Sequence, residues 1–400
     1  MDYEVSELHR VCMIAPMPFL EDRGAPIRVY GEAKGLTKLG HRVDVVCYHL
    51  GREVPEAIKI QRIIRIPWYR RIVAGPTYHK AYLDVLLLFK ALKVVKGNSF
   101  DILHAHLHEG AAVAHTLNLL FKINKPVIFD AQGSLTGEMI AHGSIEPSSF
   151  MFRFWKLVES KICDGSGLIL ASSSHLVEML RKEFGISKEK IKYVPDGVDT
   201  DLFNPDRFNG EEIRRKYELG DDNNIIIYTG IFSRYQGLNF LIEEVIPYVV
   251  KERKDAKFML IGYPVDEYRE LAGKVGVKKS IVFTGKQRLD EIPKFLAAAD
   301  ISVTPKFMEM GEANLKILTY MAMGLPTVSF DYMHNKQMLR GSGLTTKPGD
   351  AKEFATAILK LLDNPRRKKE MGQRAKAIAQ NEYSWLSTAR KIVEIYDKVT

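Results

Sequence analysis

The segment 300–328, which reads DISVTPKFMEMGEANLKILTYMAMGLPTV, contains residues whose types and spacing suit the binding of an anionic group. A short apolar strand is expected at 301–305, running out into a loop. The apolar residues of 315–322 recur every three or four positions, which predicts a helix, and Asn314 is its expected N-cap. The first turn of such a helix presents unpaired backbone N–H groups and the positive end of the helix dipole, and Lys316 adds a formal charge. Standing alone, the pattern also fits an ordinary βαβ unit that binds nothing.

The rest of the chain predicts the elements that would hold this segment in place. Short apolar strands alternate with helices in the first half, and the alternation restarts after 193–205, which is rich in Pro, Gly, Asp and Asn. The 400 residues also exceed what one hydrophobic core serves, which is roughly 250 to 300 residues. We therefore expect an α/β fold of two Rossmann-like domains with parallel sheets, facing a central cleft where ligands bind at the carboxyl ends of the strands.

The individual elements follow from the same apolar patterns. A helix is expected at 28–39, and another at 238–250, where Pro247 should kink or shorten it. Amphipathic helices follow residue 350. Strands are expected at 10–15, 43–48, 102–105, 127–130, 168–171, 225–229, 258–261, 281–284, 301–304 and 327–330.

Composition limits the classes of protein to which the chain can belong. Hydrophobic residues at 46% and charged residues at 27% are ordinary for a globular protein. The net charge of +9 favours an anionic ligand or surface, but no aromatic-interleaved basic strand or recognition helix points to nucleic acid. Cys12, Cys47 and Cys163 lie in apolar runs without metal-binding spacing and are expected to be reduced core thiols. The polar start at 1–10 lacks the apolar region of a signal peptide, so we expect a cytoplasmic protein, with the inner face of the membrane as an alternative location.

Four stretches carry a further pattern when they are read in order. They are GAPIRVYGEAKGLTKLGHRVDVVCY at 24–48, IKYVPDGVDTDLFNP at 191–205, IIYTGIFSRYQGLNFLIE at 226–243, and the segment 300–328. Together they resemble the retaining, nucleotide-sugar-dependent glycosyltransferases of the GT-B fold, in the large group related to sucrose synthase and the phosphatidylinositol mannosyltransferases. The ending resembles that family's C-terminal helix, which crosses back onto the N-terminal domain. The expected division is an acceptor-side domain at 1–195, a nucleotide-sugar-binding domain at 196–380 and the crossing helix at 381–400.

The resemblance implies a UDP- or GDP-hexose as the donor substrate, with no required cofactor. Gly24 would let the backbone come close to the diphosphate or sugar, or it is a plain loop glycine. Arg28, at the start of the following helix, would bind phosphate or be a solvated helix residue. The donor-binding residues implied in this way are Gly24, Arg28, His106, Gly230, Arg234, Asn314, Leu315 and Lys316.

The third stretch departs from the family's pattern. Relatives usually have an arginine just after the glycine and a lysine before the second glycine, both holding the diphosphate, but this chain has Ile231 and Gln236 there. Arg234, in the same loop, could supply a bidentate phosphate contact, or it could be a surface arginine in a turn. A family glutamate that binds ribose aligns with Thr319, which puts that contact in doubt.

Asp130, Gln132 and Glu312 are the residues expected at the reacting centre. Glu312 is the candidate for a carboxylate facing the sugar, with Glu309 as the second candidate, and solvated loop glutamates are the alternative. Gln132 stands where many relatives have a histidine, so it could position the sugar but could not carry a proton. Asp130, at a strand's end, could orient the acceptor or stabilise positive charge on the sugar, or it could serve a capping or turn role.

The run HAHLHEG at 104–110 contains three alternating histidines. Alternation on a strand puts His104 and His106 on one face, but the local sequence has no carboxylate spacing that completes a metal site. His106 and Glu109 lie where the strand opens toward the expected cleft, so one of them is expected to contact acceptor or donor. We expect no metal.

The acceptor is expected on the N-terminal domain. The segments 67–71 and 79–96 mix aromatic, aliphatic and cationic residues, which suits peripheral association with an anionic membrane. The alternative is a helix that packs on the core on one side and is solvated on the other. The acceptor class stays open between a glycan, a lipid-linked molecule and a small molecule.

The predicted activity is transfer of a hexose to a hydroxyl acceptor with retention of configuration. Lys316, Arg234 and the helix amides would stabilise the leaving diphosphate. The alternatives are an inactive or regulatory nucleotide-sugar-binding protein, which the three departures favour, and a GT-B epimerase or phosphorylase. A Rossmann oxidoreductase is disfavoured because no GxGxxG follows the first strand.

Overall fold

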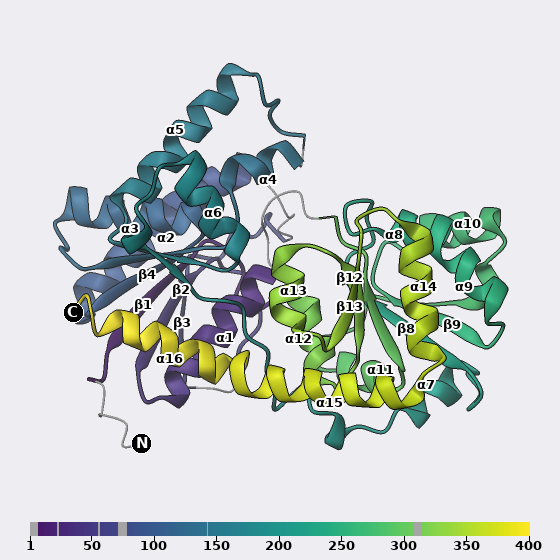
Figure 1. The fold of residues 1–400 in the computed structure, drawn as a ribbon. Helices are drawn as coiled ribbons and strands as arrows, with labels where there is room; N and C mark the ends of the chain where they lie inside the picture. The colour runs from purple at the N-terminus through teal and green to yellow at the C-terminus, as the bar shows by residue number, and fades with distance from the viewer. Residues whose placement is uncertain (1–6, 22–23, 55–56, 71–77, 142, 308–313) are drawn as a thin grey trace. The chain divides into compact units, whose positions relative to one another are not determined.

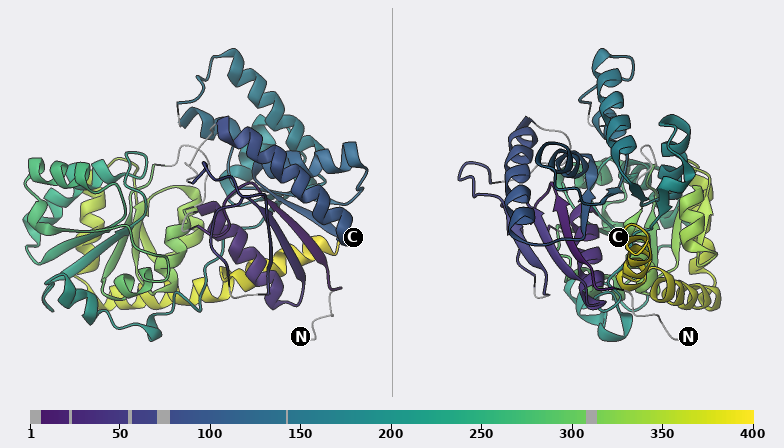
Figure 2. Two further views of the ribbon diagram at one scale, coloured as in Figure 1. Left: turned by 180° about the vertical axis from the view of Figure 1, so that it is seen from behind. Right: turned by 90° about the vertical axis from the view of Figure 1, so that its left-hand side faces the viewer.

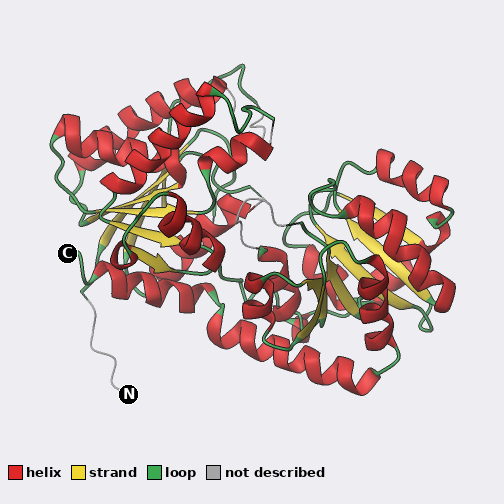
Figure 3. Ribbon diagram, turned by 45° about the horizontal axis from the view of Figure 1, so that its top comes forward, coloured by secondary structure: helices red, strands yellow, loops and turns green. Residues whose placement is uncertain are grey.

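The structure is a computed structural model that describes residues 7–21, 24–54, 57–70, 78–141, 143–307 and 314–400. These residues form two compact units. Unit 1 contains most of the first 197 residues together with Trp385–Thr400, and unit 2 contains the described residues between Val198 and Ser384. Each unit is built around a parallel sheet with helices on both faces (Figure 3).

Within the described part of unit 1, the sheet has seven strands in the order β3-β2-β1-β4-β5-β6-β7 (Figure 1). Its central strands are buried along almost their whole length because helices cover both faces, and this explains why they are mostly apolar in the sequence. From β1 the sheet extends to one side through β2 and β3 and to the other side through β4 to β7, so the strand order reverses between β1 and β4. Parallel sheets of this kind bind ligands at such a point. The strands are β1 Arg10–Ala15, β2 Arg42–Cys47, β3 Lys59–Arg62, β4 Ile102–His106, β5 Val127–Ala131, β6 Leu168–Ala171 and β7 Ile191–Tyr193.

Two apolar clusters lie on the two faces of this sheet. One joins the sheet to α1 and α16, and the other joins it to α2, α3, α5 and α6. The helices of unit 1 are α1 Gly24–Lys38, α2 Tyr78–Gly97, α3 Leu107–Phe121, α4 Leu135–Ala141, α5 Phe150–Gly165, α6 Ser174–Glu183, the 3₁₀ turn η1 Lys188–Lys190 and α16 Trp385–Tyr396.

The C-terminal helix α16 packs against α1, at the other end of the sequence (Figure 2). A glycine makes this approach possible, because a Cβ atom on Gly31 would lie 2.0 Å from the ring of Trp385. At its far end α16 places the hydroxyl of Tyr396 at 2.6 Å from Nδ1 of His104 in β4. The last helix therefore closes one face of the sheet and reaches its central strand.

Unit 2 repeats the architecture, and its described strands form a sheet of six in the order β10-β9-β8-β11-β12-β13. Apolar clusters again fill both faces. The strands are β8 Asn224–Thr229, β9 Ala256–Ile261, β10 Ile281–Gly285, β11 Ile301–Thr304, β12 Thr327–Phe330 and β13 Gly343–Thr346. The helical segments are η2 Pro205–Arg207, α7 Glu211–Lys216, α8 Leu238–Phe240, the π-turn η3 Leu241–Val245, α9 Ile246–Glu252, α10 Asp266–Val275, η4 Lys278–Ser280, α11 Ile292–Ala297, α12 Leu315–Ala322, α13 Met333–Leu339, α14 Ala351–Leu362 and α15 Pro365–Glu382.

The expected α/β class with two parallel sheets is confirmed, and every predicted strand is present within one or two residues at each end. The helix expected at 28–39 begins earlier than predicted, because α1 spans Gly24–Lys38. The helical segment expected at 238–250 is not shortened at Pro247, because α8, the π-turn η3 and α9 follow one another without a gap as far as Glu252, and Pro247 lies in the first turn of α9, directly after the π-turn.

The three cysteines are buried and unpaired, as expected of core thiols. In α2 the residues Leu83, Leu87 and Ala91 are fully buried in the core, so core packing, the alternative to a membrane surface, is confirmed for that face of the helix. Among the residues that the structure describes, no helix combines the length and the hydropathy that a bilayer span requires.

Candidate functional site

In unit 2, Lys316 is the centre of a small polar cluster at the carboxyl end of β8. Its Nζ donates to Oε1 of Gln236 at 2.7 Å and to the hydroxyl of Tyr228 at 3.1 Å. The same ammonium group lies over the Tyr228 ring, 4.4 Å from the centroid. The Tyr228 hydroxyl donates onward to the carbonyl of Ile231 at 3.0 Å, which ties the loop after β8 to the start of α12.

The strand β8 and the helix α12 are fixed to each other by a second tyrosine. The buried hydroxyl of Tyr320 accepts a hydrogen bond from the backbone N–H of Thr229 at 2.8 Å and lies 3.0 Å from its side-chain oxygen. Directly after Thr229 the chain turns at Gly230 with φ +136°, a conformation that favours glycine. A Cβ atom there would lie 3.0 Å from Nζ of Lys316. Gly230 therefore leaves the ammonium group approachable from the loop side.

The loop that departs from the family's pattern contributes to this cluster through Gln236. Gln236 is buried and its side-chain oxygen accepts from Lys316, so the position where relatives have a lysine is joined to the lysine that this chain has. Ile231 is partly exposed, and Arg234 in the same loop is exposed. Lys316 and Arg234 are the cations that the described residues place on this loop and helix start.

The start of α12 differs from the expectation in one respect. Asn314 does stand just before the helix, but its side chain does not cap it; Nδ2 donates instead to the hydroxyl of Thr304 in β11 at 2.9 Å. Its Oδ1 accepts no hydrogen bond from the described part of the chain. The first helical residue is Leu315, as expected, and Thr319 bonds within the helix, to the carbonyl of Lys316 at 2.8 Å. Glu309 and Glu312 lie outside the described residues.

In unit 1, Arg28 lies in a buried network of carboxylates. Its side chain is only 2% exposed, so the solvated alternative was wrong. Its Nε and Nη2 donate to both oxygens of Asp130 at 2.8 Å, and Nη1 donates to Asp196 at 2.8 Å. A third ion pair joins it to Glu32 at 3.0 Å. With its donors turned inward, the guanidinium has almost no surface left for a phosphate, which argues against the expected phosphate contact.

Asp130 and His106 are fully buried in the same network. Asp130 accepts from Arg28, from Nδ1 of His106 at 2.9 Å, and from the amide of Gln132 at 3.2 Å. Burial alone would raise the pKa of Asp130, but the charge of Arg28 lowers it well below its usual range. Neither residue presents a surface to an acceptor or donor, and Asp130 caps no helix among the described residues. Its hydrogen bond with Gln132, which is half-buried, holds that amide in position. Gln132 is thus the member of this group that a substrate could reach.

The histidines of β4 lie beside carboxylates that their local sequence did not reveal. Glu32, His104, His106 and Asp130 place potential metal ligands within 4.8 Å of one another, so the expectation that no carboxylate completes the set was wrong. The rings of His104 and His106 are stacked, and Nε2 of each has no hydrogen-bond partner among the described residues. Arg28 already supplies the positive charge inside this cluster, which explains its carboxylates without a metal.

The structure shows the surroundings of two other predicted positions, Gly24 and Glu109. Gly24 is the first residue of α1 and lies in open space, with no atom within 4 Å of a Cβ placed there, so no neighbour in the structure requires a glycine. Glu109 pairs with Lys80 of α2 at 3.2 Å. Sequence reasoning missed Tyr228, Glu32 and Asp196; Glu32 could have been found from its position four residues after Arg28 on a helix face that is otherwise apolar.

A second buried ion pair holds the helix that follows Gln132. Glu159 of α5 accepts from the backbone N–H groups of Leu135 and Thr136, both at 3.0 Å, at the start of α4. His108 of α3 pairs with Glu159 at 3.4 Å. Burial would lower the pKa of His108, but hydrogen bonds with Cys163 and Glu159 raise it to about 10. The start of α4 is therefore occupied by a protein carboxylate.

We expect His108→Gln to destabilise the protein in a pH-dependent way. His108 binds its proton more tightly in the folded state (pKa about 10) than in the unfolded chain, about 6.5. Its contribution is therefore complete below pH ~6.5 and disappears as the pH rises toward 10. Urea unfolding at pH 6, 8 and 10 should show the gap between wild type and variant closing with increasing pH. A gap that stays constant would contradict the ion pair.

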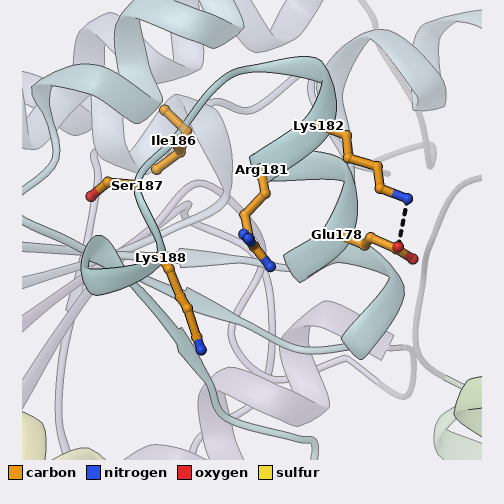
Figure 4. Close-up of a pocket in the computed structure, with 6 residues that line it drawn as sticks. All are labelled: Glu178, Arg181, Lys182, Ile186, Ser187 and Lys188. Carbon is orange, nitrogen blue, oxygen red and sulfur yellow. Dashed lines mark ion pairs between the residues drawn. The ribbon is translucent and has the colours of Figure 1, made fainter.

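A basic hollow on unit 1 lies apart from the predicted residues. Arg181, Lys182 and Lys188 line a space of about 330 Å³, and Lys182 pairs with Glu178 at 2.7 Å. Figure 4 shows these side chains and the ion pair. It is formed by the end of α6 and the turn η1, just before β7 begins. It thus lies at the amino edge of the sheet, opposite the edge where ligands bind in such folds.

Two family models match most of the chain. Residues 23–202 match the model described as Glycosyltransferase Family 4, and residues 223–364 match the model described as Glycosyl transferases group 1. The D-inositol 3-phosphate glycosyltransferase of Corynebacterium aurimucosum is 22% identical over 93% of this chain and 90% of its own length. The GDP-mannose-dependent alpha-(1-6)-phosphatidylinositol monomannoside mannosyltransferase of Mycobacterium tuberculosis is 25% identical over 58% of this chain and 62% of its own.

Solved structures show the same fold at low identity. Anabaena HepE in complex with UDP has a TM-score of 0.74 at 17% identity and covers 97% of this chain and 100% of its own. Sucrose-phosphate synthase from Thermosynechococcus elongatus has a TM-score of 0.76 at 16% identity and covers 97% and 98%. The chain therefore belongs to the group 1 glycosyltransferases and has the GT-B fold.

Proposed function

We propose that this protein transfers a hexose from a nucleoside diphosphate sugar to a hydroxyl acceptor, with retention of configuration. The observation that carries the proposal is the convergence of Lys316, Gly230 and the start of α12 at the carboxyl end of β8. A fixed ammonium group, approachable backbone and a helix N-terminus together suit a diphosphate. The names of relatives and neighbours, which mention UDP and GDP-mannose, support a nucleotide donor.

In the proposed reaction the bond between the anomeric carbon and the diphosphate oxygen breaks as the acceptor oxygen bonds to the same carbon. Lys316, Arg234 and the amides at the start of α12 would stabilise the negative charge that grows on the leaving diphosphate. The acceptor would attack from the face that the diphosphate leaves, and its proton would pass to the leaving phosphate, so configuration is retained. Gln132 would position the sugar or acceptor by hydrogen bonds, without carrying a proton.

One observation favours a nucleotide-sugar-binding protein without activity: the chain departs from the family's pattern at Ile231, Gln236 and Thr319. Gln236 argues the other way, because it orients Lys316. A thermal-shift panel of UDP-, GDP- and ADP-hexoses identifies the donor, since a ligand at about 100 times its Kd stabilises the protein by about 2.7 kcal/mol.

The identified donor is then incubated with lipid, glycan and small-molecule acceptors, and the anomeric configuration of the product is read by NMR. Transfer with retention supports the proposal. Tight donor binding without transfer to any acceptor would favour the inactive protein. Turnover of the donor alone, or only with inorganic phosphate, would identify an epimerase or a phosphorylase.

A further inference from the structure

Exposed apolar side chains gather on one face of α5 in unit 1. Phe150, Phe154 and Leu157 are 79%, 46% and 58% exposed. Their spacing of four and three residues places them in one stripe along the helix. An apolar stripe of a globular helix normally faces the core, whereas this one faces solvent.

The end of α3 extends this apolar face. Leu119, near the last turn of α3, is 79% exposed. Between α3 and α5 lies a surface hollow of about 880 Å³, lined by Leu119, Leu157, Val158 and Ile162 among others. The stripe on α5, the hollow and Leu119 therefore form one continuous apolar surface, which we name the α3–α5 surface.

The position of α5 makes this surface available to a flat partner. The first turns of α5, which contain Phe150 and Phe154, stand clear of the other helices of unit 1 (Figure 1, and Figure 2 right). The helix is held in this position from its other end, where Ile162 and Cys163 enter the core and Glu159 binds the start of α4. A rigid helix thus carries aromatic side chains at a projecting tip.

Positive charges flank the apolar stripe. Arg153 and Lys161 are exposed on the same helix, and Lys122 is exposed just after α3. Lys156 also lies on α5, partly exposed and paired with Glu183 at 3.5 Å. The acidic residues nearby are Glu159, which is buried and paired with His108, and the exposed Glu146 and Asp164 at the two ends of the helix. Aromatic residues at a projecting tip with cations alongside match the boundary of an anionic bilayer.

We infer that the α3–α5 surface docks on an anionic lipid membrane. Phe150, Phe154 and Leu157 enter the boundary between headgroups and acyl chains, while Arg153 and Lys161 meet the anionic headgroups. A second copy of the chain is a poorer occupant, because a two-fold interface would bring these cations against the same cations of the partner. The role of this docking rests on the proposed function: a glycosyltransferase held at the membrane would meet a lipid-linked acceptor there.

Vesicle flotation tests the inference directly. Wild type should float with vesicles of equal parts phosphatidylcholine and phosphatidylglycerol, and much less with phosphatidylcholine alone or in high salt. The double variant Phe150→Ser, Phe154→Ser should bind the anionic vesicles at least about tenfold more weakly than wild type. The double variant Arg153→Glu, Lys161→Glu should lose the preference for anionic lipid. The matched control Met333→Ser, an exposed apolar residue of unit 2, should bind as wild type does.

Fluorescence gives a second readout on the same helix. Of the three tryptophans, Trp385 is buried and Trp155 lies in α5, so in a Trp68→Phe background a blue shift of the emission on addition of anionic vesicles should come from Trp155. No flotation of the wild type, or unchanged flotation of the serine variant, would overturn the inference. So would a concentration-dependent dimer that the serine variant abolishes, because a second copy would then cover this surface.

The outcome is separable from that of the proposed function. The serine variant should keep the full thermal shift with the nucleotide-sugar donor, since both phenylalanines are exposed and lie in unit 1. Wild type that floats but binds no donor would refute the proposed function and leave the docking surface in place. Wild type that binds donor but does not float would refute the docking surface alone.

Discussion

Replacing Lys316 by methionine is expected to weaken donor binding by about tenfold to 150-fold. Methionine keeps the length and the apolar stem that packs on the Tyr228 ring, and it removes the ammonium group. A hydrogen bond to a charged group contributes about 1.5 to 3 kcal/mol, which corresponds to that range of Kd. Isothermal titration with the nucleotide sugar identified in the panel measures the change. Lys294→Met, a surface lysine of α11 paired with Glu291, is the matched control and should bind the donor normally.

The same substitution should also lower the stability of the unliganded protein. Gln236 is buried and its Oε1 would lose its donor, which costs about 1 to 3 kcal/mol. Two effects are thus expected, a lower melting temperature without ligand and a smaller shift with ligand. If the melting temperature falls while the ligand shift is unchanged, Lys316 is a packing residue only and the donor site lies elsewhere.

The sequence predicted the central strands of both sheets because a strand buried on both faces is apolar along most of its length. The strands that were missed are β3, β7 and β13, with the sequences KIQR, IKY and GLTT. They lie at sheet edges, where only part of each residue is buried and polar residues are tolerated. Their identity depends on neighbouring strands that local sequence does not reveal.

The candidate site was predictable as a position but not as a set of contacts. The end of β11 and the start of α12 are local features, so Lys316 could be singled out from its own segment. Its partner Gln236 lies 80 residues earlier in the chain, and only the pairing of β8 with β11 brings the two together. A glutamine where relatives have a lysine looked like lost charge, whereas in the fold it orients the lysine that remains.

Arg28 was misjudged for a different reason. A charged residue at the start of a surface helix is expected in solvent, because burying it without partners is costly. Three carboxylates from separate parts of the chain compensate that cost: Glu32 in α1, Asp130 in β5 and Asp196 after β7. Their convergence is a property of the fold and has only one local signal, the spacing of Arg28 and Glu32.

Arg28→Met is expected to lower the free energy of unfolding by about 3 to 5 kcal/mol, because it leaves buried carboxylates without their counter-charge. The neighbouring change Glu32→Gln should cost much less, since burial raises the pKa of Glu32 well above its usual value and makes its charge the least favoured of the three, while Asp130 and Asp196 stay paired with Arg28. Urea unfolding of the two variants and wild type provides the comparison. Equal losses from both would contradict a network centred on Arg28.

The pH dependence of Arg28→Met should have the opposite sign to that of wild type. In wild type the pKa of Asp130 is lowered, so its contribution is present above the ordinary carboxyl pKa and is lost as the pH falls further. Without Arg28 the buried Asp130 should bind a proton more readily, and the variant should recover part of its deficit between pH 7 and pH 5. Donor binding by the folded variant should persist, because the guanidinium donates to Asp130 and Asp196 within unit 1. Loss of donor binding would instead support the phosphate contact that the resemblance implied.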